Sequence, residues 1–347
     1  MNVVGAGAQA DGWDSPGIRR RLSGMGDVLG MLAVLGALIL LFGMLSKYFW
    51  TAQTLRTIVN QNADLTVVAV GMTLVLVIGG IDLSVGSVLA FSGTVLGMTL
   101  VDRGWPLWLA VVACLGVGAS CGLINGLVTV LWSIPSFIVT LGMLEAARGA
   151  AYLVANSETK YIGERVERIA QPVSGLGVST AFLIAVALVV VGHVLLTRTV
   201  LGRYMIAVGT NEEAVRLSGI DPRPVKLVAF VLSGLMAALG SLFQVARLSS
   251  ADPNGSVGME LGAIAAVVIG GTSLMGGRGS VLRTFLGVLI IATLQTGLAQ
   301  VGASEPAKRL ITGAVIVLAV IADVHRGNWA ASLSRLAARS SAGRPSH

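Results

Sequence analysis

The chain has 347 residues, of which 54% are hydrophobic and 12% charged, with a formal net charge of +7. A soluble domain of this length needs far more polar surface than this composition supplies. The apolar runs are continuous over about 20 residues, which excludes a transmembrane β-barrel, whose strands alternate over about 10 residues. The composition therefore predicts an all-α, polytopic membrane protein.

Glycine is abundant, with 45 residues, while aromatic residues make up only 5% of the chain. Helices in lipid associate through close packing at small residues, so this balance is typical of a helical bundle. The basic residues follow the loops, which favours positive-inside topology and argues against a nucleic-acid partner. Cys114 and Cys121 are one heptad apart in one apolar segment and lack ligand spacing, so no metal site is expected.

About ten membrane-spanning helices are predicted, each from roughly 20 apolar residues. The predicted spans cover residues 27–46, 56–78, 82–101, 106–131, 134–155, 178–197, 226–248, 260–275, 280–301 and 308–323. The eighth is short and rich in glycine, which favours a tilted, interrupted or re-entrant segment. We expect residues 1–24 and 326–347 to form cytoplasmic tails on either side of a transmembrane domain at residues 25–325.

Basic residues place both termini and the long loop at residues 198–225 in the cytoplasm. Three consecutive arginines at residues 19–21 precede the first span, and no small-residue cleavage site ends that span. This pattern predicts a cytoplasmic anchor rather than a cleaved signal peptide. Residues 156–177 then lie outside. Their mixed charge fits a partner-facing surface and fits equally a solvated loop that binds nothing.

An interruption follows the second predicted span. Gly79 and Gly80 allow the chain to break, and Asp82 or Ser84 can accept hydrogen bonds from the freed N–H groups of the next helix. A capping role for Asp82 is favoured over contact with a solute. A position beside a transport pathway follows as a consequence, because an ionisable group is tolerated in a membrane where it meets water.

The same interruption carries one half of an internal repeat. The sequence VIGG occurs at residues 77–80 and again at 268–271, and GSVL occurs at 86–89 and again at 279–282. The repeat indicates either a duplicated helix–break–helix element, of the kind that flanks the pathway in many transporters, or a chance match in a glycine-rich chain.

Two pairs of polar residues lie within or near other spans. Glu145 and Arg148 are three residues apart, which predicts an ion pair across one helix turn rather than a substrate or gating role. Gln244 and Arg247 lie near the end of the seventh span. They are pathway candidates that fit contact with a polar solute and contact with a docking partner equally well.

The loop at residues 198–225 contains GTNEEAVRLSGI, which predicts a short amphipathic helix. Thr210 and Glu213 have the spacing of a capping box, and Gly219 ends the helix. A rigid helix between two spans is suited to pass force from a motor protein into the bundle. The predicted docking residues are Thr210, Asn211, Glu212, Glu213, Ala214, Val215, Arg216, Leu217, Ser218 and Gly219.

The sequence lacks the glycine-rich phosphate-binding motif of ATPases and the common catalytic motifs of hydrolases and metalloenzymes. The chain is therefore predicted not to be an enzyme and to bind no cofactor. If transport is driven by ATP, then ATP and Mg²⁺ bind another polypeptide.

Four long stretches resemble the ribose-type permease family of bacterial ABC importers, which also includes permeases for other sugars and autoinducer-2. They are GMTLVLVIGGIDLSVGSVLA (71–90), GLINGLVTVLWSIPSFIVTLGMLEAARGAAYL (122–153), LGRYMIAVGTNEEAVRLSGIDPRPVK (201–226) and ELGAIAAVVIGGTSLMGGRGSVLRTFLGVLI (260–290). The resemblance implies a permease in the bacterial inner membrane that pairs with a second permease subunit. It also implies a cytoplasmic ATP-binding subunit that receives the helix at residues 210–219, and a periplasmic binding protein that supplies a sugar.

The alternative is an ion-coupled secondary transporter of a small polar solute, because interrupted helices also occur in that class. It leaves the docking helix without a role. A branched-chain amino-acid permease is the nearest related interpretation, and GGIDLSVGS and NEEAVRLSGI argue against it by resemblance alone. The sequence leaves open which sugar is carried and whether the permease pairs with itself or with a paralogue.

Overall fold

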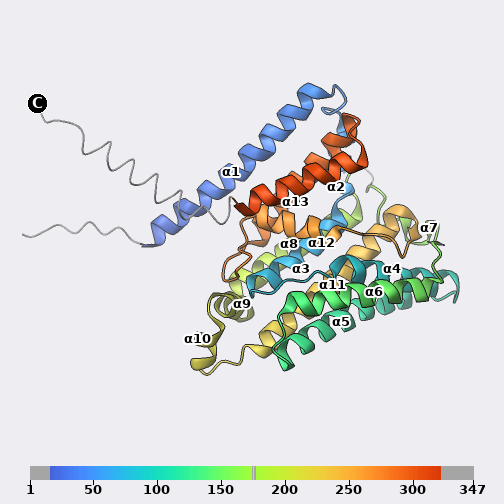
Figure 1. Ribbon diagram of the computed structural model, residues 1–347. Coiled ribbons are helices and arrows are strands. Elements are labelled where there is room, and N and C mark those ends of the chain that lie inside the picture. Colours follow the sequence, from blue (N-terminus) through green and yellow to red (C-terminus); the bar gives the residue numbers. More distant parts are fainter. Residues whose placement is uncertain (1–15, 174, 176, 322–347) are drawn as a thin grey trace, which may run out of the picture.

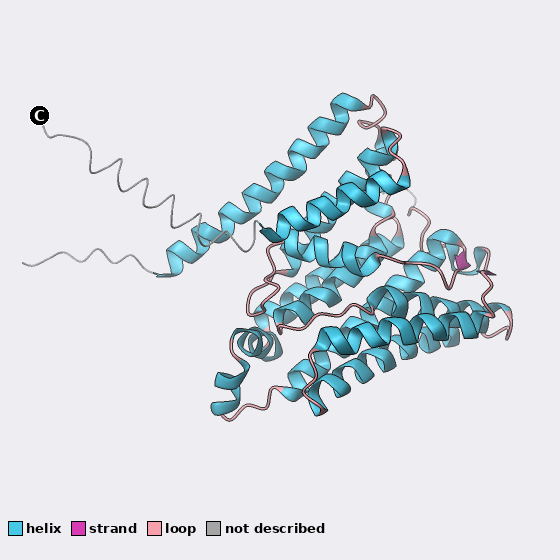
Figure 2. Cartoon of the chain, in the orientation of Figure 1, coloured by secondary structure: helices cyan, strands magenta, loops and turns pink. Residues whose placement is uncertain are grey.

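The computed structural model describes residues 16–173, 175 and 177–321, and the described chain is mainly helical (Figures 1 and 2). The prediction of an all-α membrane protein is therefore confirmed. The helices are α1 (Pro16–Leu45), α2 (Ala52–Asn60), α3 (Ala63–Val77), α4 (Val85–Val101), α5 (Leu107–Leu131), α6 (Ser136–Ala155), α7 (Glu164–Glu167), α8 (Thr180–Arg198), α9 (Val200–Thr210), α10 (Glu212–Leu217), α11 (Arg223–Leu248), α12 (Met259–Ile269) and α13 (Val281–Gln300). Residues 305–321 are also helical.

Ten membrane-spanning helices were predicted, and fewer helices are long and apolar enough to cross a membrane. In the described residues, six helices are long and apolar enough (α1 from Gly26, α5, α6, α8, α11 and α13), and α2 with α3 makes a seventh, bent by 42°. The other predicted spans correspond to α4, to α12 and to the helix at residues 305–321. The apolar helices α4 and α12 have only 17 and 11 residues, because each adjoins a glycine break.

The helix α1 begins at Pro16, within the predicted N-terminal tail, and its apolar part begins at Gly26. Residues 1–15 and 322–347, which hold the rest of both predicted tails and the end of the last predicted span, lie outside the described residues.

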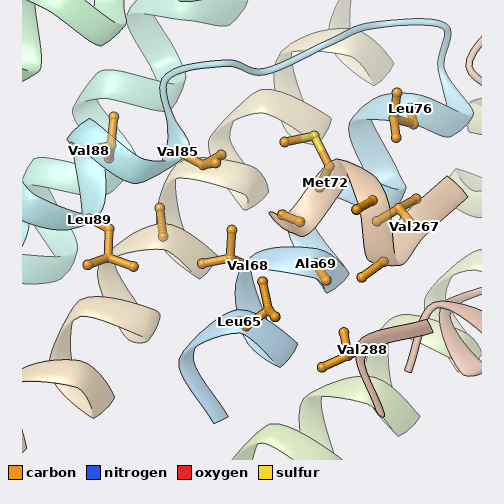
Figure 3. Packing of buried hydrophobic residues seen from close by; sticks show 14 of the residues in the cluster. Leu65, Val68, Ala69, Met72, Leu76, Val85, Val88, Leu89, Val267 and Val288 are labelled. Atoms are coloured by element: carbon orange, nitrogen blue, oxygen red, sulfur yellow. The ribbon is translucent and has the colours of Figure 1, made fainter. Parts of the chain in front are cut away.

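The helix α3 is the centre of the bundle, and every one of its side chains is buried. Its apolar residues pack against α4, α12 and α13 in one continuous core (Figure 3). The residues labelled there are Leu65, Val68, Ala69, Met72, Leu76, Val85, Val88, Leu89, Val267 and Val288. A helix buried on all sides needs no polar face, which explains why α3 is apolar after its first turn apart from Thr73.

The helices α5 and α11 approach so closely that their backbones touch. A Cβ atom on Gly118 of α5 would lie 2.6 Å from the Cβ of Ala238, and one on Gly234 of α11 would lie 3.0 Å from the backbone N of Gly122. Small residues at such crossings supply the van der Waals contact that holds helices together in lipid.

Residues 160–166, within the segment predicted to lie outside, pack against the bundle. The strand β1 (Lys160–Tyr161) pairs antiparallel with β2 (Ser250–Ala251), and Val166 is 1% exposed. The Lys160 ammonium lies 3.2 Å from the Asp102 carboxylate at the end of α4, and their hydrogen bond raises the pKa of Lys160. These contacts fix the segment against the ends of α4 and α11.

We predict that Gly118→Val strongly destabilises the protein, whereas Gly116→Val on the same helix does not. The added side chain at Gly118 meets the backbone of α11, while a Cβ at Gly116 meets nothing within 4 Å. Overpacking of this kind costs about 1–3 kcal/mol or more. The measurement is the thermal unfolding midpoint of the two purified variants in detergent, and equal midpoints would contradict the close α5–α11 contact.

Candidate functional site

The predicted docking helix is present as α10, and its first turn differs from the prediction. Thr210 is the last residue of α9, and its hydroxyl donates to the carbonyl of Ile206 at 2.7 Å. Asn211 caps α10 instead, because its side-chain oxygen accepts from the N–H of Ala214 at 2.9 Å. The predicted capping box between Thr210 and Glu213 is therefore wrong. Asparagine caps helices as well as threonine does. Because α9 continues to Thr210, the N-cap of α10 lies one residue later than predicted.

Most of α10 faces outward from the chain. Val215 is buried and anchors the helix, whereas Leu217 is 79% exposed. The carboxylate of Glu213 lies 2.7 Å from the guanidinium of Arg216, and their hydrogen bond raises the pKa of Arg216. The carboxylate of Glu212 lies 2.5 Å from the ammonium of Lys226 on α11. The helix therefore presents an exposed leucine among charged side chains that are already paired.

The C-terminal end of α9, just before α10, is fixed to both helix breaks by backbone contacts. The N–H of Gly277, in the break between α12 and α13, donates to the carbonyl of Val77, the last residue of α3, at 2.9 Å. A Cβ on Gly209 would lie 2.6 Å from the N of Gly277, and one on Gly276 would lie 2.9 Å from the Cα of Gly79. We call Gly79, Gly209, Gly276 and Gly277 the glycine junction. At Gly209, Gly276 and Gly277 only glycine permits these contacts, since a Cβ there would lie within 3.0 Å of backbone atoms, while Gly79 adopts a φ of +78°.

The break between α3 and α4 is held by a buried polar network around Asp82, which is 1% exposed. Its carboxylate accepts from the N–H and the hydroxyl of Ser84 at 3.0 and 2.6 Å, and from the hydroxyl of Ser233 on α11 at 2.8 Å. The amide of Asn125 on α5 donates to the Ser84 hydroxyl at 3.0 Å. Ser84 occupies the N-cap position of α4 and makes no cap bond with its own side chain. Asp82 thus ties the break directly to α11.

The break between α12 and α13 uses the same backbone geometry. Gly79 has a φ of +78° and donates to Leu76 at 2.9 Å, and Gly271 has a φ of +75° and donates to Val268 at 2.8 Å. Both are Schellman endings, in which the next N–H also donates back into the helix, from Gly80 to Val75 at 2.9 Å and from Thr272 to Val267 at 3.1 Å, and in which glycine avoids a steric penalty. The repeated VIGG sequence aligns Gly79 with Gly270, so the structural repeat is offset from the sequence repeat by one residue.

A polar cavity of about 560 Å³ lies between the α2–α3 junction, the end of α11, the start of α12 and the end of α13. These elements lie at the end of the bundle opposite to α10 (Figure 1). Its polar lining residues are Thr57, Gln61, Asn62, Asp64, Gln244, Arg247, Ser256, Gln295, Thr296 and Gln300. The structure therefore brings the predicted pathway residues Gln244 and Arg247 together in one cavity. It does not bring them near Gly79, Gly80, Asp82 or Ser84, which belong to the first break.

The cavity is ordered by polar contacts in its wall. The Arg247 guanidinium lies 2.8 Å from the carboxylate of Asp64, and the side-chain oxygen of Gln244 accepts from the Ser256 hydroxyl at 2.7 Å. Sequence reasoning missed Asp64 and the glutamines of α13. The polar sequence QNAD at residues 61–64, inside a predicted span, was the available indication of a bend in that span.

The predicted ion pair between Glu145 and Arg148 is not formed. Arg148 donates instead to the carbonyls of Pro253 and Gly255 at 2.5 and 2.9 Å, in the loop after α11. Glu145 is exposed and has no hydrogen bond or ion pair within the part of the chain that the structure describes. A guanidinium prefers this site because the loop carbonyls are otherwise unpaired acceptors that a long side chain can reach.

Comparison with known proteins identifies the family. A family model described as "Branched-chain amino acid transport system / permease component" matches residues 54–320. The chain belongs to this permease family. The ribose import permease protein of Escherichia coli (strain K12) is 40% identical over 299 residues, which cover 84% of this chain and 92% of that protein. The L-arabinose ABC transporter permease protein of Azospirillum brasilense is 34% identical over 314 residues, covering 89% and 92%. The fructose import permease protein of Rhizobium meliloti is 35% identical over 306 residues, covering 84% of each chain. The resemblance found in the sequence is confirmed.

We predict that Asp82→Asn leaves folding and activity nearly unchanged, whereas Asp82→Ala destabilises the protein. The amide oxygen of asparagine can still accept from Ser84, and its NH₂ group can donate to the hydroxyl of Ser233. Alanine leaves buried donors unpaired, at a cost of about 1–3 kcal/mol each. Thermal unfolding of both variants in detergent measures the difference. A stable asparagine variant that has lost all transport would instead assign the carboxylate charge to the pathway.

Proposed function

We propose that this permease moves a sugar across the bacterial inner membrane as one subunit of an ABC importer. A separate cytoplasmic ATP-binding subunit, which holds ATP and Mg²⁺, drives the transport, and a periplasmic binding protein supplies the solute. The observation that carries the proposal is the set of relatives named for ribose, arabinose and fructose, at 34–40% identity over most of the chain. A second permease subunit completes the membrane part.

The two ends of the bundle support this division of work. An exposed helix, α10, lies at one end, and we assign that end, with both termini, to the cytoplasm and to the ATP-binding subunit. The polar cavity lies at the other end, which then faces the periplasm. The ATP-binding subunit therefore docks at one end of the bundle and the solute enters at the other, as an importer driven from the cytoplasm requires.

The chemistry of the cavity suits a sugar. Sugar hydroxyls donate and accept hydrogen bonds, and the cavity offers amides that do both, from Gln61, Asn62 and Gln295. The charges of Asp64 and Arg247 neutralise each other in the wall, so no net charge selects for an ionic solute. Weak contacts of this kind favour passage, because tight binding in one state would oppose release.

The proposal gives α10 a mechanical role that passes through the glycine junction. When the ATP-binding subunit closes on ATP, it displaces the docked α10. The end of α9 moves with it, and the backbone contacts of Gly209 and Gly277 transmit that movement to the two helix breaks. When packed helices have two stable arrangements, a small shift of α9 switches the solute pathway between outward and inward access.

The deciding experiment is reconstitution in lipid nanodiscs with the ATP-binding and binding proteins encoded by neighbouring genes. We expect one pentose or hexose, presented by its binding protein, to stimulate ATP hydrolysis. Leu217→Asp should abolish the stimulation, since it places a charge on the exposed apolar residue of α10, while Leu261→Asp, on an exposed residue of α12, should leave docking intact. Uptake that follows an ion gradient without the ATP-binding subunit would replace the proposal with a secondary transporter.

We further expect Gly209→Ala to uncouple hydrolysis from transport. The added methyl group must push the end of α9 away from Val77 and Gly277, whereas Gly36→Ala on α1 adds a methyl group that meets nothing within 4 Å. Sugar transported per ATP hydrolysed should fall by roughly tenfold for Gly209→Ala. Binding of the ATP-binding subunit should persist in both variants. Unchanged coupling in Gly209→Ala would exclude the glycine junction as the transmission point.

A further inference from the structure

An apolar groove of about 590 Å³ lies between α1, the end of α12, α13 and the last helix that the structure describes. Its floor is buried, with Met31, Val268 and Ile290 at most 5% exposed. Its rim is open, since Gly30 on α1 is exposed and Leu318 on the opposite wall is 64% exposed. The groove is therefore a slot in the outer surface of the bundle.

Two contacts hold α1 alongside α13, and the groove begins at the first of them (Figure 1). The Asp27 carboxylate on α1 lies 2.9 Å from the Arg283 guanidinium near the start of α13. Near the other end of α13, Gly297 lies so close to the ring of Phe42 that a Cβ there would clash with it. Between the two contacts, a Cβ on Gly30 would meet nothing within 4 Å. Space therefore remains beside this glycine, which makes no close helix contact.

The position and lining of the groove suit a lipid tail. The apolar part of α1 begins at Gly26, so the groove lies along the membrane-spanning part of that helix. Apart from Asp27, its lining side chains carry no N–H or oxygen that could hold water. Val34 is seven residues beyond Asp27, and Ile290 is seven beyond Arg283, so the groove extends about 10 Å from the ion pair along both helices. An acyl chain from the bilayer fills such a slot and gains dispersion contacts with its walls.

The ion pair at the end of the groove complements a zwitterionic headgroup. One N–H of Arg283 donates to Asp27, and a guanidinium carries five such donors. The two side chains are 21% and 35% exposed, so a headgroup can reach both. A phosphate accepts from a guanidinium, and a primary ammonium donates to a carboxylate. Phosphatidylethanolamine carries both groups, whereas phosphatidylcholine has no ammonium N–H and phosphatidylglycerol has no positive charge.

We propose that this groove binds one molecule of phosphatidylethanolamine, with an acyl chain between α1 and α13 and the headgroup on the Asp27–Arg283 pair. The lipid phosphate accepts from Arg283, and the lipid ammonium donates to Asp27. Ile269, the last residue of α12, lines the groove, so the bound lipid lies against the second helix break. The site is separate from the polar cavity and from α10. It goes beyond the proposed transport function and does not depend on it.

Retention of lipid by the full chain tests the site. The delipidated protein in detergent is incubated with phosphatidylethanolamine, phosphatidylcholine or phosphatidylglycerol and measured by native mass spectrometry. We expect one phosphatidylethanolamine per chain, bound roughly tenfold more tightly than the other two, because each lacks one charge-assisted hydrogen bond. Gly30→Leu fills the groove and should weaken this binding roughly tenfold, which is the effect of losing about two buried methylene contacts. Gly36→Leu is the matched control on α1, because a Cβ there also meets nothing within 4 Å and Gly36 lies outside the groove.

Equal retention by Gly30→Leu and Gly36→Leu overturns the groove as the lipid site, and equal retention of all three lipids overturns the headgroup assignment. If Gly30→Leu does not fold, Ala319→Leu fills the groove from the opposite wall. The photo-reactive variant Val34→p-benzoylphenylalanine should cross-link to lipid in nanodiscs. A cross-link to residues 322–347 or to a second copy of the chain assigns the groove to protein and overturns the proposal. No measurement uses sugar or the ATP-binding subunit, so its failure and the failure of the proposed function are distinguishable.

Discussion

The structure depends on one constraint, which is that a backbone N–H or C=O group within lipid must find its partner inside the protein. The break between α3 and α4 meets this constraint with side chains from another helix. The hydroxyl of Ser136 accepts from the N–H of Ile81 at 2.9 Å, and the hydroxyl of Thr140 accepts from the N–H of Leu83 at 3.1 Å. An interrupted helix in this protein is therefore also a point of attachment to α6. A break that satisfied its own groups would leave the helices free to move independently.

The same constraint connects the surface helix α10 to the interior of the bundle. Gly209 of α9 lies against backbone atoms of both breaks, and the 2.9 Å bond from the N–H of Gly277 to the carbonyl of Val77 joins the two breaks to each other. Side chains can change rotamer to absorb a small movement, whereas backbones in direct contact cannot. A displacement of α9 must therefore move the breaks or rupture the contact. Glycine at these positions makes the connection stiff, although glycine elsewhere makes a chain flexible.

The sequence predicted those features that local chemistry determines. Long apolar runs identified the helices, and paired glycines located both breaks. Prediction from the sequence failed where a side chain bonds to a residue that is distant in the sequence. Asp64 was hidden inside a predicted span because its partner, Arg247, is 183 residues away. Arg148 had the spacing to pair with Glu145 but reaches carbonyls of the loop after α11, which no local pattern reports. The cap of α10 moved to Asn211 because the sequence does not determine where α9 ends.

The carboxylates of Asp64, Asp82 and Glu145 lie in three different environments. Asp64 is neutralised by an opposite charge, and Asp82 is surrounded by hydroxyl and N–H donors. These two solutions lie within one chain, so both sites are complete in the monomer. Glu145, on the outer face of α6, has neither kind of partner among the residues that the structure describes.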